Sequence, residues 1–118
     1  MGDIYVDGPV FLAILDRDDP GHARAATAWV AALDGGKALA TSNYVVVEAC
    51  GLIQGRLGPE ALRAFVEDML PAVEVRTVTP EQHSTALVAL VAARRPELTL
   101  VDCTSSLVKR SGADETLA

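Results

Sequence analysis

The stretch IYVDGPVFLAIL, residues 4–15, decides how the fold begins. Its first three residues are apolar and suit a short buried strand, which ends at Asp7. Pro9 follows two positions later and precedes the apolar run Val10–Leu15, and proline is favoured in the first turn of a helix. The sequence therefore predicts a strand that turns directly into a helix, with Asp7 at the junction.

Strands and helices are expected to alternate along the rest of the chain, separated by single glycines and prolines. The predicted strands are Ala38–Ala40, Val73–Val78 and the beginning of one more at Glu115–Ala118. The predicted helices are His22–Leu33, a helix capped by Thr41 or Ser42 that runs to Leu57, Glu60–Leu70, Glu81–Ala93 and Leu100–Arg110. This alternation predicts an α/β fold with a short, mainly parallel central sheet flanked by helices, whose last strand is incomplete.

Composition limits the classes of protein that fit. The 118 residues, half of them apolar, favour a single domain over residues 1–118. The two cysteines have neither zinc-ribbon nor CxxC spacing, and no apolar run has the length of a membrane span. We therefore expect a reduced, cytoplasmic protein. The net charge of −6 argues against a broad basic surface, so any RNA binding must be local and metal-assisted.

Glu48 is the most informative single residue, because it is the only side chain between Ser42 and Gln54 that is charged at neutral pH. Its neighbours three and four positions away along the predicted helix are mostly apolar, so its carboxylate is expected inside the protein. An unpaired charge there would cost several kcal/mol. The two interpretations are a functional site and a buried ion pair with an arginine from elsewhere.

Asp7 and Asp102 are each ambiguous alone. Asp7 could complement the dipole of the following helix, and Asp102 could form a capping box with Thr99. Together with Glu48 they would make a set of hard oxygen ligands, which Mg²⁺ or Mn²⁺ prefers, and a cation would relieve the repulsion among them. Asp7, Glu48 and Asp102 are therefore the candidate metal ligands and catalytic residues.

Three blocks of the sequence resemble the PIN-domain family, in particular the VapC toxins of bacterial type II toxin–antitoxin pairs. The blocks are IYVD at residues 4–7, TSNYVVVE at 41–48 and LTLVDCTSS at 98–106. The resemblance covers nearly the whole chain and implies a PIN-like α/β/α sandwich. It also implies a metal-dependent endoribonuclease, a hydrolase in which Asp7 and Asp102 hold Mg²⁺ or Mn²⁺ and Glu48 positions or activates water. The implied partners are an RNA substrate, a cognate antitoxin protein and a second copy in a homodimer.

Two features depart from the family pattern. The family has a serine or threonine after its first aspartate, whereas Gly8-Pro9 supplies no hydroxyl group here. A fourth acidic residue after the last strand would fall beyond Ala118, so we expect a truncated chain with weaker metal affinity and cleavage than the family at large. These departures motivate the alternative of a catalytically weakened PIN module, which binds RNA or an antitoxin-like partner without efficient cleavage.

A third function, that of a phospho-acceptor receiver, needs an acidic pair after the first strand and a central acceptor aspartate, and the sequence offers neither convincingly. The paired basic residues Arg94-Arg95 and Lys109-Arg110 could meet phosphates near the acidic site. They are explained equally well as solvated cations near helix C-termini.

Overall fold

The computed structural model describes residues 4–112 and 115–116 and has four parallel strands in one sheet, in the order β3-β2-β1-β4. The strands are β1 (Ile4–Tyr5), β2 (Leu39–Ser42), β3 (Val73–Arg76) and β4 (Glu115–Thr116). Ile4 pairs with Leu39 on one side and with Glu115 on the other, so β1 lies inside the sheet. The predicted α/β class with a parallel sheet is confirmed.

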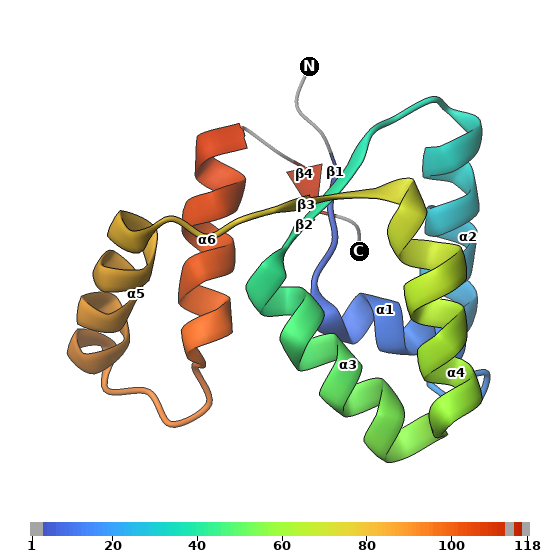
Figure 1. Ribbon diagram of the computed structural model, residues 1–118, viewed down its shortest axis with the longest axis horizontal. Coiled ribbons are helices and arrows are strands. Elements are labelled where there is room, and N and C mark those ends of the chain that lie inside the picture. Colours follow the sequence, from blue (N-terminus) through green and yellow to red (C-terminus); the bar gives the residue numbers. More distant parts are fainter. Residues whose placement is uncertain (1–3, 113–114, 117–118) are drawn as a thin grey trace.

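Helices cover the sheet on both sides (Figure 1). They are α1 (Gly8–Leu15), α2 (His22–Asp34), α3 (Asn43–Leu57), α4 (Pro59–Ala64), α5 (Pro80–Ala93) and α6 (Leu100–Gly112), with a π-helical turn η1 (Phe65–Met69) and a 3-10 turn η2 (Leu70–Ala72) after α4. In Figure 1, α5 and α6 stand on one side of the strands and α1, α2 and α4 on the other. Helix α3 packs against both α1 and α6.

The hydrophobic core lies between the sheet and α1–α4. Phe11 on α1 is fully buried, and its ring makes edge-to-face contacts with Phe65 at 5.0 Å and with Trp29 at 6.2 Å between centroids. Such aromatic pairs stabilise a fold by more than the burial of their apolar area alone.

Among the described residues, no helix combines the length and the apolarity that crossing a membrane requires.

The strand predicted over Ala38–Ala40 spans Leu39–Ser42 in the structure, and two other predicted elements differ more. The single helix expected over Glu60–Leu70 is divided into α4, η1 and η2, and the backbone N–H of Leu70 donates to the carbonyl oxygen of Phe65, five residues earlier. Phe65 and Met69, at the two ends of this π-turn, are both buried in the core. The strand expected to reach Val78 ends at Arg76, because the Val78 N–H donates to the Asn43 side chain instead of a neighbouring strand.

Helix starts follow the local signals in the sequence closely. The Ser42 side chain caps α3 by accepting a hydrogen bond from the Val45 N–H at 3.1 Å. Thr79 and Gln82 form a complete capping box at the start of α5. Ser42 is also the last residue of β2, so the strand passes into α3 without a loop. This junction fixes where α3 leaves the edge of the sheet.

Candidate active site

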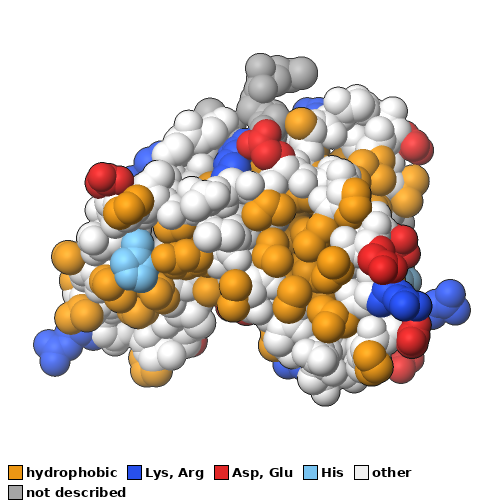
Figure 2. Space-filling model, viewed as in Figure 1, with side chains coloured by type: hydrophobic (Ala, Val, Ile, Leu, Met, Phe, Trp, Pro, Cys, Tyr) orange, Lys and Arg blue, Asp and Glu red, His pale blue; other side chains and the backbone are white. Residues whose placement is uncertain are grey.

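The three candidate carboxylates come from three different elements that meet near the C-terminal ends of the strands. Asp7 lies two residues after the end of β1, Glu48 lies on α3, which continues from β2, and Asp102 lies in the first turn of α6. In open parallel sheets, ligands bind in the crevice beyond these strand ends. Figure 2 shows the lower edge of the surface hollowed between the α5–α6 pair and α3.

Asp7 is held at the end of its strand by the backbone that precedes it. The Val6 N–H donates to the carbonyl oxygen of Ala40, and the Val6 carbonyl accepts from the buried Thr41 hydroxyl at 2.7 Å. Asp7 is the N-cap residue of α1, yet its side chain makes no capping hydrogen bond. Its partly exposed carboxylate therefore makes no capping hydrogen bond, although its charge lies at the N-terminal end of α1, where it complements the helix dipole.

Glu48 is partly buried and lies against the first residue of α1. A Cβ atom added at Gly8 would come within 2.7 Å of Glu48 Oε1, closer than real Cβ contacts. The absence of a side chain at Gly8 therefore gives the Glu48 carboxylate its place. Among the described residues Glu48 has no ion-pair partner, so the structure does not show the arginine pair that was the alternative for it.

The electrostatic surroundings of Glu48 connect the three acids. Burial raises the pKa of the Glu48 carboxyl above its ordinary value, and the negative charges of Asp102 and Asp7 raise it further. Both neighbours are thus close enough to disfavour the charged form of Glu48. The three acids singled out from the sequence form one electrostatically coupled group in the folded chain.

Asp102 takes part in a capping box. Its carboxylate accepts from the Thr99 N–H at 3.0 Å, and its own N–H donates to the Thr99 hydroxyl at 3.0 Å. Asp102 is also exposed. Asp102 therefore caps the start of α6, and its charge also acts on Glu48.

A buried hydrogen bond joins the elements that carry Asp7 and Asp102. The Tyr5 hydroxyl on β1 donates to Ser105 Oγ on α6 at 2.9 Å, and both side chains are almost fully buried. Lys109 Nζ lies 5.6 Å from the centre of the Tyr5 ring, within cation–π range. Burial raises the pKa of the Tyr5 hydroxyl, which keeps it a donor. These contacts fix the separation between β1 and α6 beneath the candidate site.

The donor chemistry of the three acids suits a hard divalent cation, because carboxylate oxygens are its preferred ligands. Burial first, and then the charges of Asp102 and Asp7, raise the pKa of Glu48, and a bound cation would offset both effects. Within the part of the chain that the structure describes, however, no three acidic, histidine or cysteine side chains already surround a common point. The described residues thus bring the charges of Asp7 and Asp102 to bear on Glu48 without arranging the three carboxylates around a common point.

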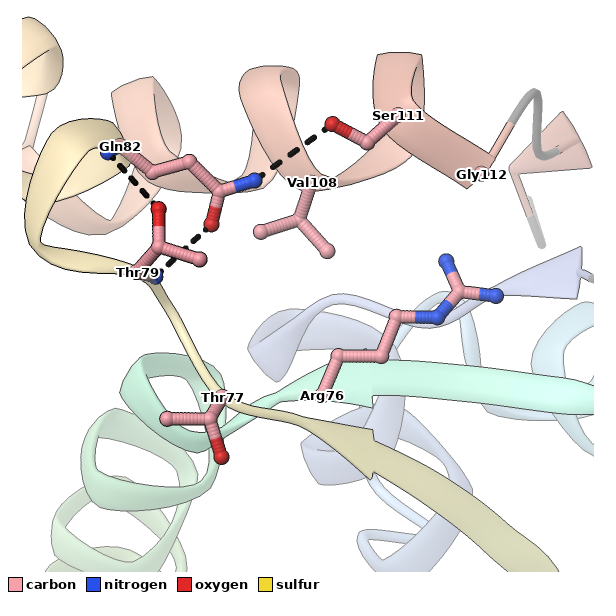
Figure 3. Close-up of a pocket in the computed structure, with 7 residues that line it drawn as sticks. All are labelled: Arg76, Thr77, Thr79, Gln82, Val108, Ser111 and Gly112. Carbon is pink, nitrogen blue, oxygen red and sulfur yellow. Dashed lines mark hydrogen bonds between the residues drawn. The ribbon is translucent and has the colours of Figure 1, made fainter.

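A different depression lies beside the C-terminal half of α6 and contains none of the three acids (Figure 3). Most of its polar side chains already have hydrogen-bond partners. Gln82 completes the capping box with Thr79 and reaches Ser111 Oγ at 3.5 Å, and the Arg76 side chain donates to Glu74 at 2.9 Å. The Gln82 contacts tie α5 to α6, so this depression has a structural explanation.

Comparison with known proteins agrees with the sequence and the fold. A family model described as the PIN domain matches residues 4–111. The chain belongs to the PIN-domain family. The predicted resemblance to VapC toxins is also confirmed, since the chain is similar to the crystal structure of Mycobacterium tuberculosis VapC20, described as a Sarcin-Ricin loop cleaving toxin. The TM-score is 0.81 at 30% identity, over 95% of this chain and 85% of that one. A comparison with curated protein sequences gave no match.

Some features of this PIN-domain site were not predicted from the sequence. Gly8 was noted only for the hydroxyl group it lacks, whereas the structure shows that its missing side chain makes room for Glu48. Tyr5 and Ser105 were not singled out at all. A tyrosine inside a short apolar strand is a usable signal, because a buried hydroxyl needs a partner elsewhere in the fold.

Proposed function

We propose that this protein is a metal-dependent endoribonuclease, the toxin component of a toxin–antitoxin pair, which hydrolyses RNA phosphodiesters at the site of Asp7, Glu48 and Asp102. The observation that carries the proposal is the placement of the three acids, with Asp7 just after β1, Glu48 on the helix that continues β2, and Asp102 in the first turn of α6. From these places both aspartates act on the Glu48 carboxyl. Membership of the PIN family and the likeness to an RNA-cleaving VapC toxin support it.

In the proposed reaction Asp7 and Asp102 would hold Mg²⁺ or Mn²⁺, with Glu48 as a further ligand or as the residue that orients water. A bound divalent cation supplies polarisation of the phosphate and stabilises charge on the leaving oxygen. Glu48 would accept the proton of the attacking water while the water oxygen bonds to phosphorus in line with the departing oxygen. Its raised pKa suits this role, because a general base works best when its pKa lies nearer the operating pH.

The Asp102→Asn variant tests the proposed role of Asp102. Asparagine can still accept the hydrogen bond from the Thr99 N–H, so α6 keeps its cap while the charge is lost. We expect Mn²⁺-dependent cleavage of a mixed RNA pool to fall by about a hundredfold or more. Asp68→Asn, at an exposed position on η1, is the matched control. Equal cleavage by wild type and Asp102→Asn would refute the assignment.

The second candidate is a PIN module that binds RNA or an antitoxin-like partner without efficient cleavage. Two observations favour it. The Asp102 carboxylate accepts a hydrogen bond in the capping box, and the described residues contain no cluster of three acidic, histidine or cysteine side chains placed to hold a metal ion. RNA binding without any metal-dependent cleavage, equal in wild type and Asp102→Asn, would select this function.

The proposed partners are RNA, an antitoxin protein that covers the acidic site, and a second copy of the chain, all in the cytoplasm. The α5 stripe, defined as Leu87, Val88 and Val91, is the surface we assign to the homodimer. Val88 and Val91 are 70% and 78% exposed. A two-fold contact would bury this apolar stripe of both copies against each other.

The Val91→Glu variant tests the homodimer. Each substitution occurs twice in a two-fold contact, and burying one valine side chain contributes about 1.5 kcal/mol or more. We therefore expect the dissociation constant to rise by about a hundredfold, measured by analytical ultracentrifugation. Val30→Glu, on exposed α2 surface, is the control. A wild-type chain that is monomeric at high concentration, or a Val91→Glu variant as dimeric as wild type, would contradict this assignment.

A further inference from the structure

A pocket of about 390 Å³ opens between α5 and α6. Two of its lining residues, Thr85 and Ala89, come from α5, and Leu98 comes from the segment between the helices. The other lining residues lie on α6 and are Asp102, Cys103, Ser106, Leu107 and Arg110. The volume falls in the range of pockets that hold small organic molecules.

The pocket adjoins the candidate active site through Asp102. This residue is one of the three acids assigned to the site, and it also lines the pocket. A molecule in the pocket would therefore lie directly beside the group to which we assign phosphodiester hydrolysis. No other candidate acid lines this pocket.

The lining combines three kinds of surface that together match a nucleotide. Leu98, Leu107 and Ala89 give apolar contact for the face of a base, and the Thr85 and Ser106 hydroxyls can bond to its polar edge. Arg110 is the only cationic residue of the lining and can pair with a phosphate. In a chain of net charge −6, such a local cation is what an anionic ligand needs.

The order of these groups along α6 gives the pocket a direction. Asp102, Ser106 and Arg110 follow one another at four-residue intervals, so they share one face of the helix. At 1.5 Å per residue, Asp102 and Arg110 are about 12 Å apart along the axis. A phosphodiester at Asp102 and a phosphate at Arg110, one to two nucleotides further along the strand, would thus lie at the two ends of the pocket.

We propose that this α5–α6 pocket is an RNA subsite, which holds the base of a nucleotide flanking the bond to be cut while Arg110 pairs with its phosphate. The inference rests on the proposed ribonuclease function and adds to it a place for the substrate. It predicts that part of the RNA affinity is independent of metal, because the pocket residues other than Asp102 need no cation to act.

The test measures binding of a fluorescein-labelled single-stranded RNA of mixed sequence by anisotropy, in EDTA. Ala89→Phe and Ser106→Phe place a large side chain in the pocket from opposite walls. Each is expected to weaken RNA binding about tenfold, because the base of one nucleotide could no longer bind there. Arg110→Gln is expected to make the slope of log binding constant against log salt concentration shallower by about 0.7, which is the value for one phosphate contact on a single strand. Ser84→Phe and Arg56→Gln, exposed and outside the pocket, are the matched controls.

Mn²⁺ binding by calorimetry separates this inference from the proposed function, since the filled variants keep all three carboxylates. RNA binding in EDTA that is unchanged by both fillings and by Arg110→Gln would overturn the subsite, even if the wild type cleaves RNA. Loss of binding in these variants supports the subsite even if no metal promotes cleavage. If one filling variant does not fold, the other and Arg110→Gln give the answer.

Discussion

Glu48→Gln is expected to make the protein more stable and nearly inactive. Glutamine keeps the shape of the side chain and removes a charge that burial, Asp102 and Asp7 all disfavour. In EDTA at neutral pH, the free energy of unfolding should rise, by less than about 1 kcal/mol because the carboxylate is only partly buried and solvent screens it. Mn²⁺-dependent RNA cleavage should fall by about a hundredfold or more, through loss of the proposed base.

The pH dependence gives this prediction its sign. The pKa of Glu48 is raised in the folded protein above the ordinary value of 4.5, so in the window above pH 4.5 the folded state binds more protons than the unfolded state. Stability attributable to Glu48 is therefore fully present below pH 4.5 and is lost as pH rises through the folded pKa. The difference in unfolding free energy between Glu48→Gln and wild type should grow from acid to neutral pH.

Urea denaturation at several pH values in EDTA, followed by cleavage assays with Mn²⁺, checks both parts. Saturating Mn²⁺ at about a hundred times its dissociation constant should stabilise wild type by about 2.7 kcal/mol and should stabilise Glu48→Gln less. Glu60→Gln, at an exposed position on α4, is the control. A Glu48→Gln protein that is less stable than wild type at neutral pH in EDTA would show that the carboxylate has a favourable structural partner.

Gly8→Ala is expected to damage the site while leaving the fold intact. The new Cβ would lie within 2.7 Å of Glu48 Oε1, and the atom it meets is the end of a flexible side chain. The carboxylate should therefore move rather than the backbone. A displacement of about 1 Å can cost a hundredfold in rate, and disturbed ligand orientation costs about 10- to 100-fold in metal affinity.

Mn²⁺ affinity by calorimetry and single-turnover cleavage measure the effect of Gly8→Ala, and circular dichroism confirms folding. Gly51→Ala and Gly55→Ala are matched controls on α3, the helix that carries Glu48, because a Cβ at either position meets no atom within 4 Å. These controls should be slightly stabilised, since alanine is the better helix former. If Gly8→Ala binds Mn²⁺ and cleaves RNA as well as wild type does, the position of Glu48 Oε1 is not important for metal binding or cleavage.

The sequence predicted the order and type of the elements well where local chemistry specifies them. Pro9 in the first turn of α1, Ser42 at the cap of α3 and the Thr99–Asp102 capping box each act within a few residues, so they can be recognised without the fold. It failed at the π-turn after Ala64 and at the end of β3. At the π-turn the Leu70 N–H bonds to Phe65, where both Phe65 and Met69 pack in the core, and after β3 the Val78 N–H bonds to the distant Asn43.

The sequence by itself identified Glu48 as an acid without a polar helix face, and it identified Asp7 and Asp102 through a family pattern. Only the tertiary structure decided that these three acids share one electrostatic neighbourhood, and that Gly8 leaves space for Glu48. It also decided that Tyr5 bonds to Ser105, one hundred residues away. The physical reason is that caps and turns depend on neighbours in the chain, whereas charge coupling and buried hydrogen bonds depend on how the sheet and helices pack.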